Sequence, residues 1–185
     1  MKEGATMLIK NIANESDLMV QIDPDVDGFS AAALFINYLA KLFPSYVQNH
    51  ITYRLQDGKE HGIIPSTIPS NVKIVVAPDS SSNSVEECRE LAARGVDILI
   101  LDHHEADTPA DAACIINNQL CDYGNKSLAG VGIVYKFCSY LDKLMNTSYA
   151  NDFLDLVALG CVADMVSLQH FETAHLVRRG IQNVR

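Results

Sequence analysis

Acidic and imidazole side chains stand at four places in this 185-residue sequence where their types and spacing could hold divalent metal ions. The first place is the segment Asp23-Pro24-Asp25-Val26-Asp27-Gly28. Its three carboxylates would repel one another strongly if they were brought together without a cation. A divalent cation would convert that repulsion into binding, whereas a solvent-exposed acidic turn explains the segment equally well on its own.

The second place is Asp102-His103-His104, which follows an apolar segment. Adjacent histidines after a strand either form a solvated turn or supply a metal ligand beside a carboxylate that orients it. A mixture of carboxylate and imidazole ligands suits Mn²⁺ better than Ca²⁺ and does not exclude Mg²⁺. This motif therefore indicates a metal site more sharply than the first does.

Two single aspartates complete the set. Asp79 follows an apolar segment, a position where an aspartate is usually a turn residue or a helix cap. Asp164 lies in a largely apolar segment, where an unpaired charge would be costly and a metal ion is one partner that would compensate for it. Each signal is modest alone, and their coincidence favours a metal site.

Hydrophobic periodicity predicts the elements that would position these residues. Strands are expected at residues 18–23, 50–55, 72–77, 96–101 and 113–116, and helices at 29–43, 84–94 with Ser84 as cap, 129–145, 150–161 and 172–184. Glycines and prolines predict a surface loop over 57–71. Alternating strands and helices predict an α/β fold, with a mostly parallel sheet flanked by helices on both faces. Ligands bind at the carboxyl ends of such strands, where three of the four acidic motifs would meet.

The composition limits the class of protein. Apolar residues make up 48% and charged residues 20% of the chain, as in ordinary globular domains. No apolar run approaches the ~20 residues that span a bilayer, and no signal sequence begins the chain, so we expect a cytoplasmic protein without membrane contact. The 5 cysteines are scattered and never spaced as CxxC, which favours reduced thiols. A net charge of −9 argues against unaided nucleic-acid binding, although bound cations or a basic partner domain would offset it.

The order of the four motifs resembles that of the DHH phosphoesterase superfamily, from about residue 18 to the end of the chain. The matching residues are Asp25 and Asp27, Asp79, Asp102-His103-His104, and Asp164. Within the superfamily the chain is similar to the RecJ branch. Residues 23–28 resemble its Asp-Tyr-Asp-x-Asp-Gly, 128–136 its Leu-x-Gly-x-Gly-x-x-x-Lys, and 163–168 its Ala-Asp-x-x-Pro-Leu with Ser167 in place of proline. Residues 176–180 resemble the segment that follows in RecJ proteins.

The resemblance implies a role for each matching residue. Two Mn²⁺ or Mg²⁺ ions would be held by Asp25, Asp27, Asp79, His103 and Asp164, with Asp79 and Asp164 shared between them. His104 would contact the scissile phosphate, and Asp102 would orient the histidine pair. Many family members have a metal-binding histidine two residues before the position of Asp23, where this chain has Gln21. Gln21 and Asp23 are therefore possible further ligands, and an amide oxygen is the weaker of the two.

Candidate substrate contacts come from helix starts and from basic residues. Gly28 and Ser30 open a predicted helix, whose N-terminus favours an anion. Gly130 and Gly132 would allow close approach to phosphate, and helix packing explains them equally well. The basic candidates for contact with a nucleic-acid backbone are Arg54, Lys136, Arg178 and Arg179, although basic surface residues are usually just solvated.

The resemblance thus implies two-metal hydrolysis of phosphodiesters by a 5′–3′ exonuclease on single-stranded DNA, with roles in DNA repair and recombination. Residues 1–185 would form the DHH domain, without the C-terminal substrate-binding domain of the family. A first alternative is a phosphodiesterase for short oligonucleotides or cyclic dinucleotides, or a pyrophosphatase, of the same superfamily. A second is a catalytically weak DNA-binding or scaffold homologue, which the departure at Gln21 keeps open.

Overall fold

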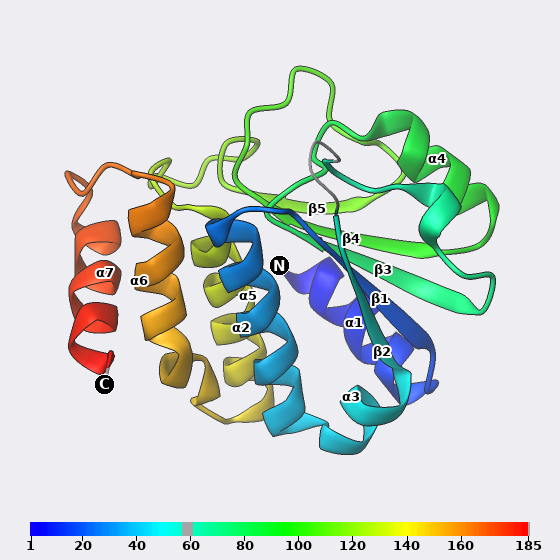
Figure 1. The fold of residues 1–185 in the computed structure, drawn as a ribbon, viewed down its shortest axis with the longest axis horizontal. Coiled ribbons are helices and arrows are strands. Elements are labelled where there is room, and N and C mark those ends of the chain that lie inside the picture. The colour runs from blue at the N-terminus through cyan, green and yellow to red at the C-terminus, as the bar shows by residue number, and fades with distance from the viewer. Residues whose placement is uncertain (57–60, 185) are drawn as a thin grey trace.

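Five parallel strands form a single sheet in the order β2-β1-β3-β4-β5 (Figure 1). The computed structural model describes residues 1–56 and 61–184. The strands are β1 (Asp17–Ile22), β2 (Ile51–Leu55), β3 (Val72–Pro78), β4 (Asp97–Asp102) and β5 (Cys114–Asn117). Each lies within one residue of a predicted strand, and the predicted α/β fold is confirmed.

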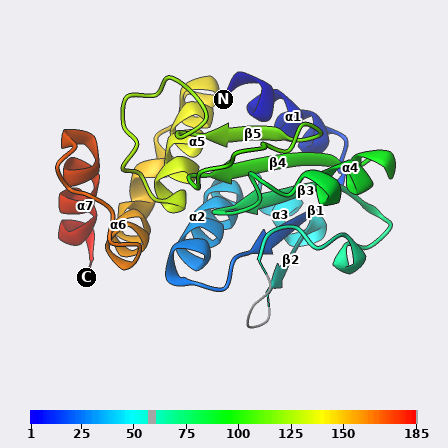
Figure 2. The same cartoon turned by 90° about the horizontal axis from the view of Figure 1, so that it is seen from above.

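Helices cover both faces of the sheet, but unequally (Figures 1 and 2). One face carries α1 (Lys2–Ala13), α2 (Val26–Leu42), α3 (Pro44–His50) and α5 (Gly130–Met145). The other face carries α4 (Val85–Ala93). An outer layer, α6 (Leu154–Ala163) and α7 (Phe171–Asn183), packs beyond α2 and α5. None of the described helices is long and apolar enough to cross a lipid bilayer.

Burial on both faces explains the nearly continuous apolar strands. In β1, Leu18 and Val20 join the larger core with α2 and α5, whereas Met19 joins the smaller core under α4. Successive side chains of a strand point to opposite faces, so each strand feeds both cores. The sheet is thereby held rigidly from both sides, which fixes the positions of the loops at its carboxyl edge.

Helix α1 was not predicted, because its buried face holds a single large apolar residue. That face consists of Gly4, Ala5, Leu8 and Asn11, and Leu8 alone gives little hydrophobic periodicity. A Cβ on Gly4 would lie 2.9 Å from Leu99 Cδ1, so the glycine lets the helix approach the sheet closely. The short α3, which starts at Pro44, was not predicted either.

Three local predictions need correction. Residues 57–60 of the predicted surface loop lie outside the described part of the chain, and the rest is partly core, with Ile63 and Ile68 only 2% and 5% exposed. This segment also contains a 3₁₀ helix, Pro65–Thr67. Ser84 stands at the N-cap of α4, but its side chain makes no capping hydrogen bond. The helix predicted at 150–161 begins instead as a 3₁₀ helix, Tyr149–Phe153, which leads into α6.

Candidate metal centre

The carboxyl ends of β1, β3 and β4 are neighbours in the sheet and bring the acidic motifs to one edge (Figure 1). Asp23 follows β1, Asp79 follows β3, and Asp102 is the last residue of β4. Asp79 adopts φ 67°, in the left-handed region that aspartate tolerates better than most residues. The sheet order therefore produces the shared edge that the sequence predicts.

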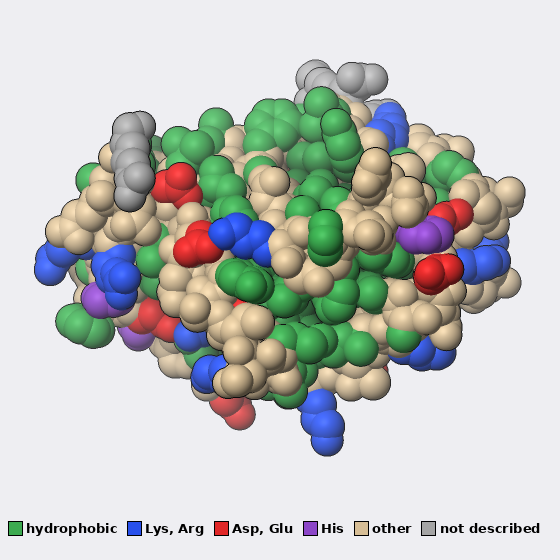
Figure 3. Space-filling view, turned by 90° about the horizontal axis from the view of Figure 1, so that it is seen from below, with side chains coloured by type: hydrophobic (Ala, Val, Ile, Leu, Met, Phe, Trp, Pro, Cys, Tyr) green, Lys and Arg blue, Asp and Glu red, His purple; other side chains and the backbone are tan. Residues whose placement is uncertain are grey.

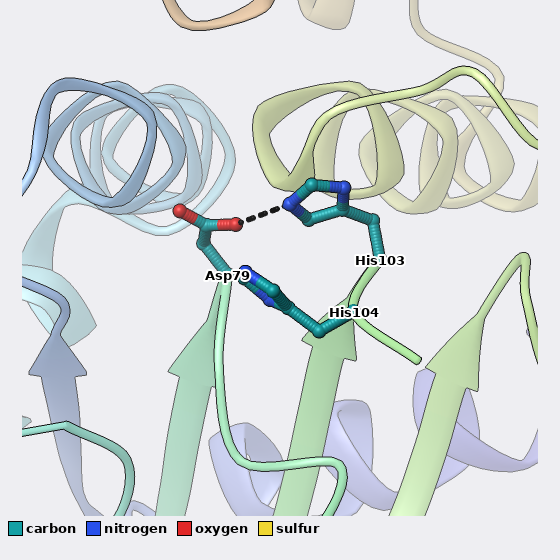
Figure 4. A group of neighbouring side chains, drawn as sticks. All are labelled: Asp79, His103 and His104. Atoms are coloured by element: carbon teal, nitrogen blue, oxygen red, sulfur yellow. Dashed lines mark ion pairs between the residues drawn. The ribbon is translucent and has the colours of Figure 1, made fainter. Parts of the chain in front are cut away.

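The imidazole of His103 lies among three carboxylates. Its Nε2 is 3.2 Å from Asp79 Oδ1, 3.8 Å from Asp27 Oδ2 and 3.9 Å from Asp164 Oδ2. Figure 4 shows His103 pointing at Asp79 from the neighbouring strand. Ligand atoms that share one ion at ~2.1 Å lie ~3–4 Å apart, depending on the angle between them. The spacing therefore fits ligands around a common cation.

A second group lies next to the first. Carboxylate oxygens of Asp23, Asp25 and Asp79 lie within 4.8 Å of one another. Asp79 contacts His103 and also belongs to this group, so one carboxylate lies between two possible ion positions. Asp164, which the resemblance makes a shared ligand, groups only with Asp27 and His103 among the described residues.

The charges of these groups call for a cation. Asp79 is 1% exposed, and its Oδ1 has no hydrogen-bond partner in the described part of the chain. Burial, and then the nearby Asp27 and Asp25, raise the pKa of Asp79 to about 10. Burial also raises the pKa of Asp27 and of Asp23. Carboxylates in such a site stay ionised only beside compensating positive charge, so the residues present fit divalent cations.

The start of α5 fixes one of these carboxylates. The backbone N–H of Gly130 donates to Asp27 Oδ2 at 2.6 Å, and that of Val131 donates to Asp27 Oδ1 at 3.1 Å. A Cβ on Gly130 would lie 2.1 Å from Asp79 Oδ1, so only glycine allows this approach. The sequence predicted that Gly130 and Gly132 allow close approach of a substrate phosphate, whereas in the structure the amides at this helix start bind Asp27. Gly132 is buried, and a Cβ there would lie 3.2 Å from the side chain of Leu128, in the segment that leads into α5.

The start of α2 is organised in a similar way. Asp25 Oδ1 accepts a hydrogen bond from Gly28 N at 2.8 Å and so caps the helix. A Cβ on Gly28 would lie 2.6 Å from Asp23 O, so the glycine lets the acidic loop fold against its own helix. Ser30 is buried inside the same helix. The local role of Gly28 is therefore to shape the loop that presents Asp25 and Asp27.

Asp102 holds the histidine pair. Its Oδ1 accepts from His103 N at 2.7 Å and from His104 Nδ1 at 2.8 Å, and its Oδ2 accepts from Ser82 N at 3.0 Å. Burial works to raise the pKa of Asp102, but the hydrogen bonds from His104 and Ser82 outweigh it and hold the pKa at about 2. The same hydrogen bond raises the pKa of His104, whose exposed ring borders a polar pocket. These are the contacts that an orienting carboxylate requires, and the catalytic roles of both residues stay predictions.

The polar pocket contains residues that sequence reasoning missed. It measures about 520 Å³ and is lined by Asp23, Asp25, Asp79, Asp102, His104 and Glu105 together with His61, Gly62 and residues 80–84. His61 Nδ1 lies 3.2 Å from Asp23 Oδ1. The run of serines after Asp79 was a usable signal of a polar wall, whereas a lone histidine in a loop without periodicity gave none.

The basic candidates lie apart from this pocket. Lys136 Nζ donates to Glu172 Oε1 at 2.7 Å and borders an apolar pocket with Tyr123 and Leu128. Arg54 lies on β2, at the position that pairs with Gln21 of β1. Arg178 and Arg179 are exposed on α7. In the view of Figure 3, hydrophobic side chains gather in the middle of the face, and Lys and Arg are scattered, one group beside acidic side chains near the middle and the others toward the edges.

The parallel α/β fold, with carboxylates and an imidazole gathered at the carboxyl edge of the sheet, defines a class of proteins with a metal centre at this place. The family described as "DHH family, N-terminal domain" matches residues 18–161. The chain belongs to the DHH family, as its motif order indicated.

The relatives lie in the RecJ branch. The putative SPbeta prophage-derived single-strand DNA-specific exonuclease YorK of Bacillus subtilis is 41% identical over 184 residues, which cover 99% of this chain and 31% of the relative. The single-stranded-DNA-specific exonuclease RecJ of the same organism is 28% identical over 190 residues, which cover 100% and 23%. A crystal structure of exonuclease RecJ bound to manganese superposes with a TM-score of 0.85 at 20% identity, over 97% of this chain and 46% of that one. The chain thus spans about a third or less of the length of these curated relatives.

Proposed function

We propose that this chain is the DHH catalytic domain of a single-strand-specific DNA exonuclease that hydrolyses phosphodiesters in the 5′–3′ direction with two bound Mn²⁺ or Mg²⁺ ions. The observation that carries the proposal is the position of Asp79 between two groups of ligands, one around His103 and one with Asp23 and Asp25. A carboxylate between two adjacent cations is typical of enzymes that hydrolyse phosphate esters. The relatives that are named single-strand-specific exonucleases support the substrate class.

The residues of the chain have separable tasks in this proposal. Asp25, Asp27, Asp79, His103 and Asp164 would hold the ions, and Asp23 or Gln21 would complete the second position. When bound, the two cations would supply Lewis acidity that activates water and neutralises charge on the phosphate. His104 would then meet the scissile phosphate, because its Nδ1–H is bound to Asp102 and its exposed edge faces the pocket.

The negative net charge of this domain limits how tightly it binds a long single strand of DNA. The net charge of −9 becomes about −5 with two divalent cations bound, which still repels a polyanion. Contacts with long DNA would therefore come mainly from outside the DHH domain, from the kind of C-terminal substrate-binding domain that the resemblance implies. The processes that we associate with the activity are DNA repair and recombination.

The test compares substrates on the metal-loaded chain. Single-stranded DNA labelled at either end is incubated with Mn²⁺, beside duplex DNA, a dinucleotide, a cyclic dinucleotide and pyrophosphate. We expect mononucleotide release from the 5′ end of the single strand, no release in EDTA, and none from the Asp79→Asn variant. Preference for the dinucleotide, the cyclic dinucleotide or pyrophosphate would assign the chain to another activity of the superfamily. Metal binding without any hydrolysis would assign it to the scaffold class.

A further inference from the structure

We propose that Asp23, held in place by His61, completes the second metal position of this site, and that Gln21 is not a ligand. The inference rests on the proposed function only in that the chain binds two divalent cations. The ligand of the second ion would then be the Asp23 carboxylate rather than the Gln21 amide on β1, and His61 would orient that carboxylate without binding the ion. The consequence is a second ion position made of oxygen atoms alone.

The first argument is the place of Gln21. This side chain is 0% exposed on β1, and its Nε2 donates to Thr67 Oγ1 at 3.4 Å and lies 3.7 Å from Met19 Sδ. Asp23, Asp25 and Asp79 all line the polar pocket, and Gln21 is not among its lining residues. Its Oε1 is buried without a hydrogen-bond partner in the described part of the chain. Because a free amide oxygen could bind a cation, a Gln21→Met variant must be shown to keep both ions.

The second argument is the place of Asp23. Its carboxylate is 5% exposed and lies in the group with Asp25 and Asp79, whose oxygens are within 4.8 Å of one another. Asp79, the third member of the group, is 1% exposed, and its Oδ1 makes no hydrogen bond within the described residues and lies 3.2 Å from His103 Nε2, on the side of the other ion position. Three carboxylates this close together repel one another, and a divalent cation between them satisfies their charge.

The third argument is the contact between Asp23 and His61. His61 Nδ1 lies 3.2 Å from Asp23 Oδ1, and the nitrogen is the donor because a carboxylate only accepts. Carboxylates that bind metals are commonly oriented by a second hydrogen bond, whose loss lowers metal affinity by about 10- to 100-fold. His61 therefore acts as a positioning residue for Asp23 rather than as a ligand.

The residues around His61 hold it in this place. Gln56 Nε2 donates to Gly62 O, and Ile63 is 2% exposed in the smaller core. Gly62 adopts φ 75°, and a Cβ there would lie 2.9 Å from Ser84 Oγ, so the backbone is tightly seated. The His61 side chain itself is 70% exposed, so its removal should cost little folding stability.

The two ion positions would then differ in chemistry. The position at His103 combines imidazole with carboxylates, whereas the position at Asp23, Asp25 and Asp79 offers only oxygen. Oxygen ligands suit Mg²⁺ and Mn²⁺ alike, and an imidazole shifts preference toward the transition metal. Mg²⁺ should therefore displace Mn²⁺ from the Asp23 position at lower concentration than from the His103 position.

The experiment counts Mn²⁺ ions on the metal-stripped chain by calorimetry and by electron paramagnetic resonance of free Mn²⁺, without substrate. We expect two ions on the unaltered chain. Asp23→Asn should lose one of them, or bind it more than 100-fold more weakly. His61→Ala should weaken the same ion by about 10- to 100-fold and leave the other unchanged. His61→Gln, which keeps a donor, should recover part of the loss, and Gln21→Met should keep both ions.

The matched control is a second histidine–aspartate pair. His50 Nδ1 lies 3.0 Å from Asp17 Oδ1 at the amino ends of β2 and β1, so His50→Ala removes a similar contact far from the site and should change neither ion. The inference is wrong if Asp23→Asn keeps two ions at the original affinity, if Gln21→Met loses one, if His61→Ala behaves like His50→Ala, or if the unaltered chain binds one ion. Two ions without DNA hydrolysis would instead refute the proposed function and leave this inference standing.

Discussion

Replacing Asp79 with asparagine should stabilise the cation-free protein while it removes the response to metal. The Asp79 carboxylate is buried, and burial together with Asp27 and Asp25 raises its pKa to about 10. An acid whose pKa is raised in the folded state destabilises the fold as pH rises from its unfolded value, about 3.9, toward the folded one. In EDTA the unaltered chain should therefore lose stability between pH 5 and pH 8. The Asp79→Asn variant lacks this titrating group, so its stability should fall less over the same pH range.

The magnitude follows from the distance in pH. From about 3.9 to pH 8 is roughly 4 units, and about 1.4 kcal/mol per unit gives an upper limit of roughly 6 kcal/mol for the cost that Asp79 imposes. The neutral amide also loses hydration on burial, which offsets part of the gain. We expect a net gain of about 1–3 kcal/mol at pH 8, or roughly 3–10 °C in Tm for a chain of this size.

The assay is thermal unfolding followed by circular dichroism, at pH 5.5 and pH 8, in EDTA and in Mn²⁺. In Mn²⁺ the order should reverse, because only the unaltered chain gains the free energy of ion binding. Asp102→Asn is the matched control at the same strand edge. Its carboxylate is also buried, but hydrogen bonds from His104 and Ser82 overcome burial and lower its pKa to about 2, so asparagine should destabilise the fold by about 1–3 kcal/mol at pH 8. The reasoning is refuted if Asp79→Asn is less stable than the unaltered chain in EDTA at pH 8, or if Mn²⁺ raises both Tm values equally.

Three further predictions follow from the site. His104→Ala should lower kcat by about 100-fold with unchanged Mn²⁺ content, whereas His103→Ala should lower both, as steady-state kinetics and elemental analysis would show; equal metal loss in the two variants would contradict this division of roles. Gly130→Ala should abolish the tight Mn²⁺ sites, because its Cβ would lie 2.1 Å from Asp79 Oδ1, while Gly124→Ala, with nothing within 4 Å, should bind as the unaltered chain does in calorimetry. The chain alone should bind a fluorescent single strand weakly in Mn²⁺ at near-physiological salt, since it carries −9 and its Lys and Arg are dispersed in the view of Figure 3. Nanomolar affinity by fluorescence anisotropy would show that the DNA groove is complete within these residues.

The glycines show how a sequence signal can be correct in place and different in meaning. The sequence predicts a helix that starts near Gly130, with glycines that allow a close approach. The structure has that helix start, but its amides bind Asp27, a residue 103 positions earlier in the chain. Helix N-termini attract any anion, so the local pattern does not distinguish a phosphate from a carboxylate of the same chain.

The sequence by itself determined the fold class, the five strands and the strand edge where Asp23, Asp79 and Asp102 meet. It could do so because periodic burial is a local property, and because parallel strands always present their carboxyl ends on one side. Only the tertiary structure decided that Asp79 lies between two ligand groups, that the start of α5 fixes Asp27, and that His61 meets Asp23 across 38 residues. Those contacts depend on how α5 and the segment before β3 pack against the sheet. Such packing comes from side chains distant in sequence, and no short-range pattern records it.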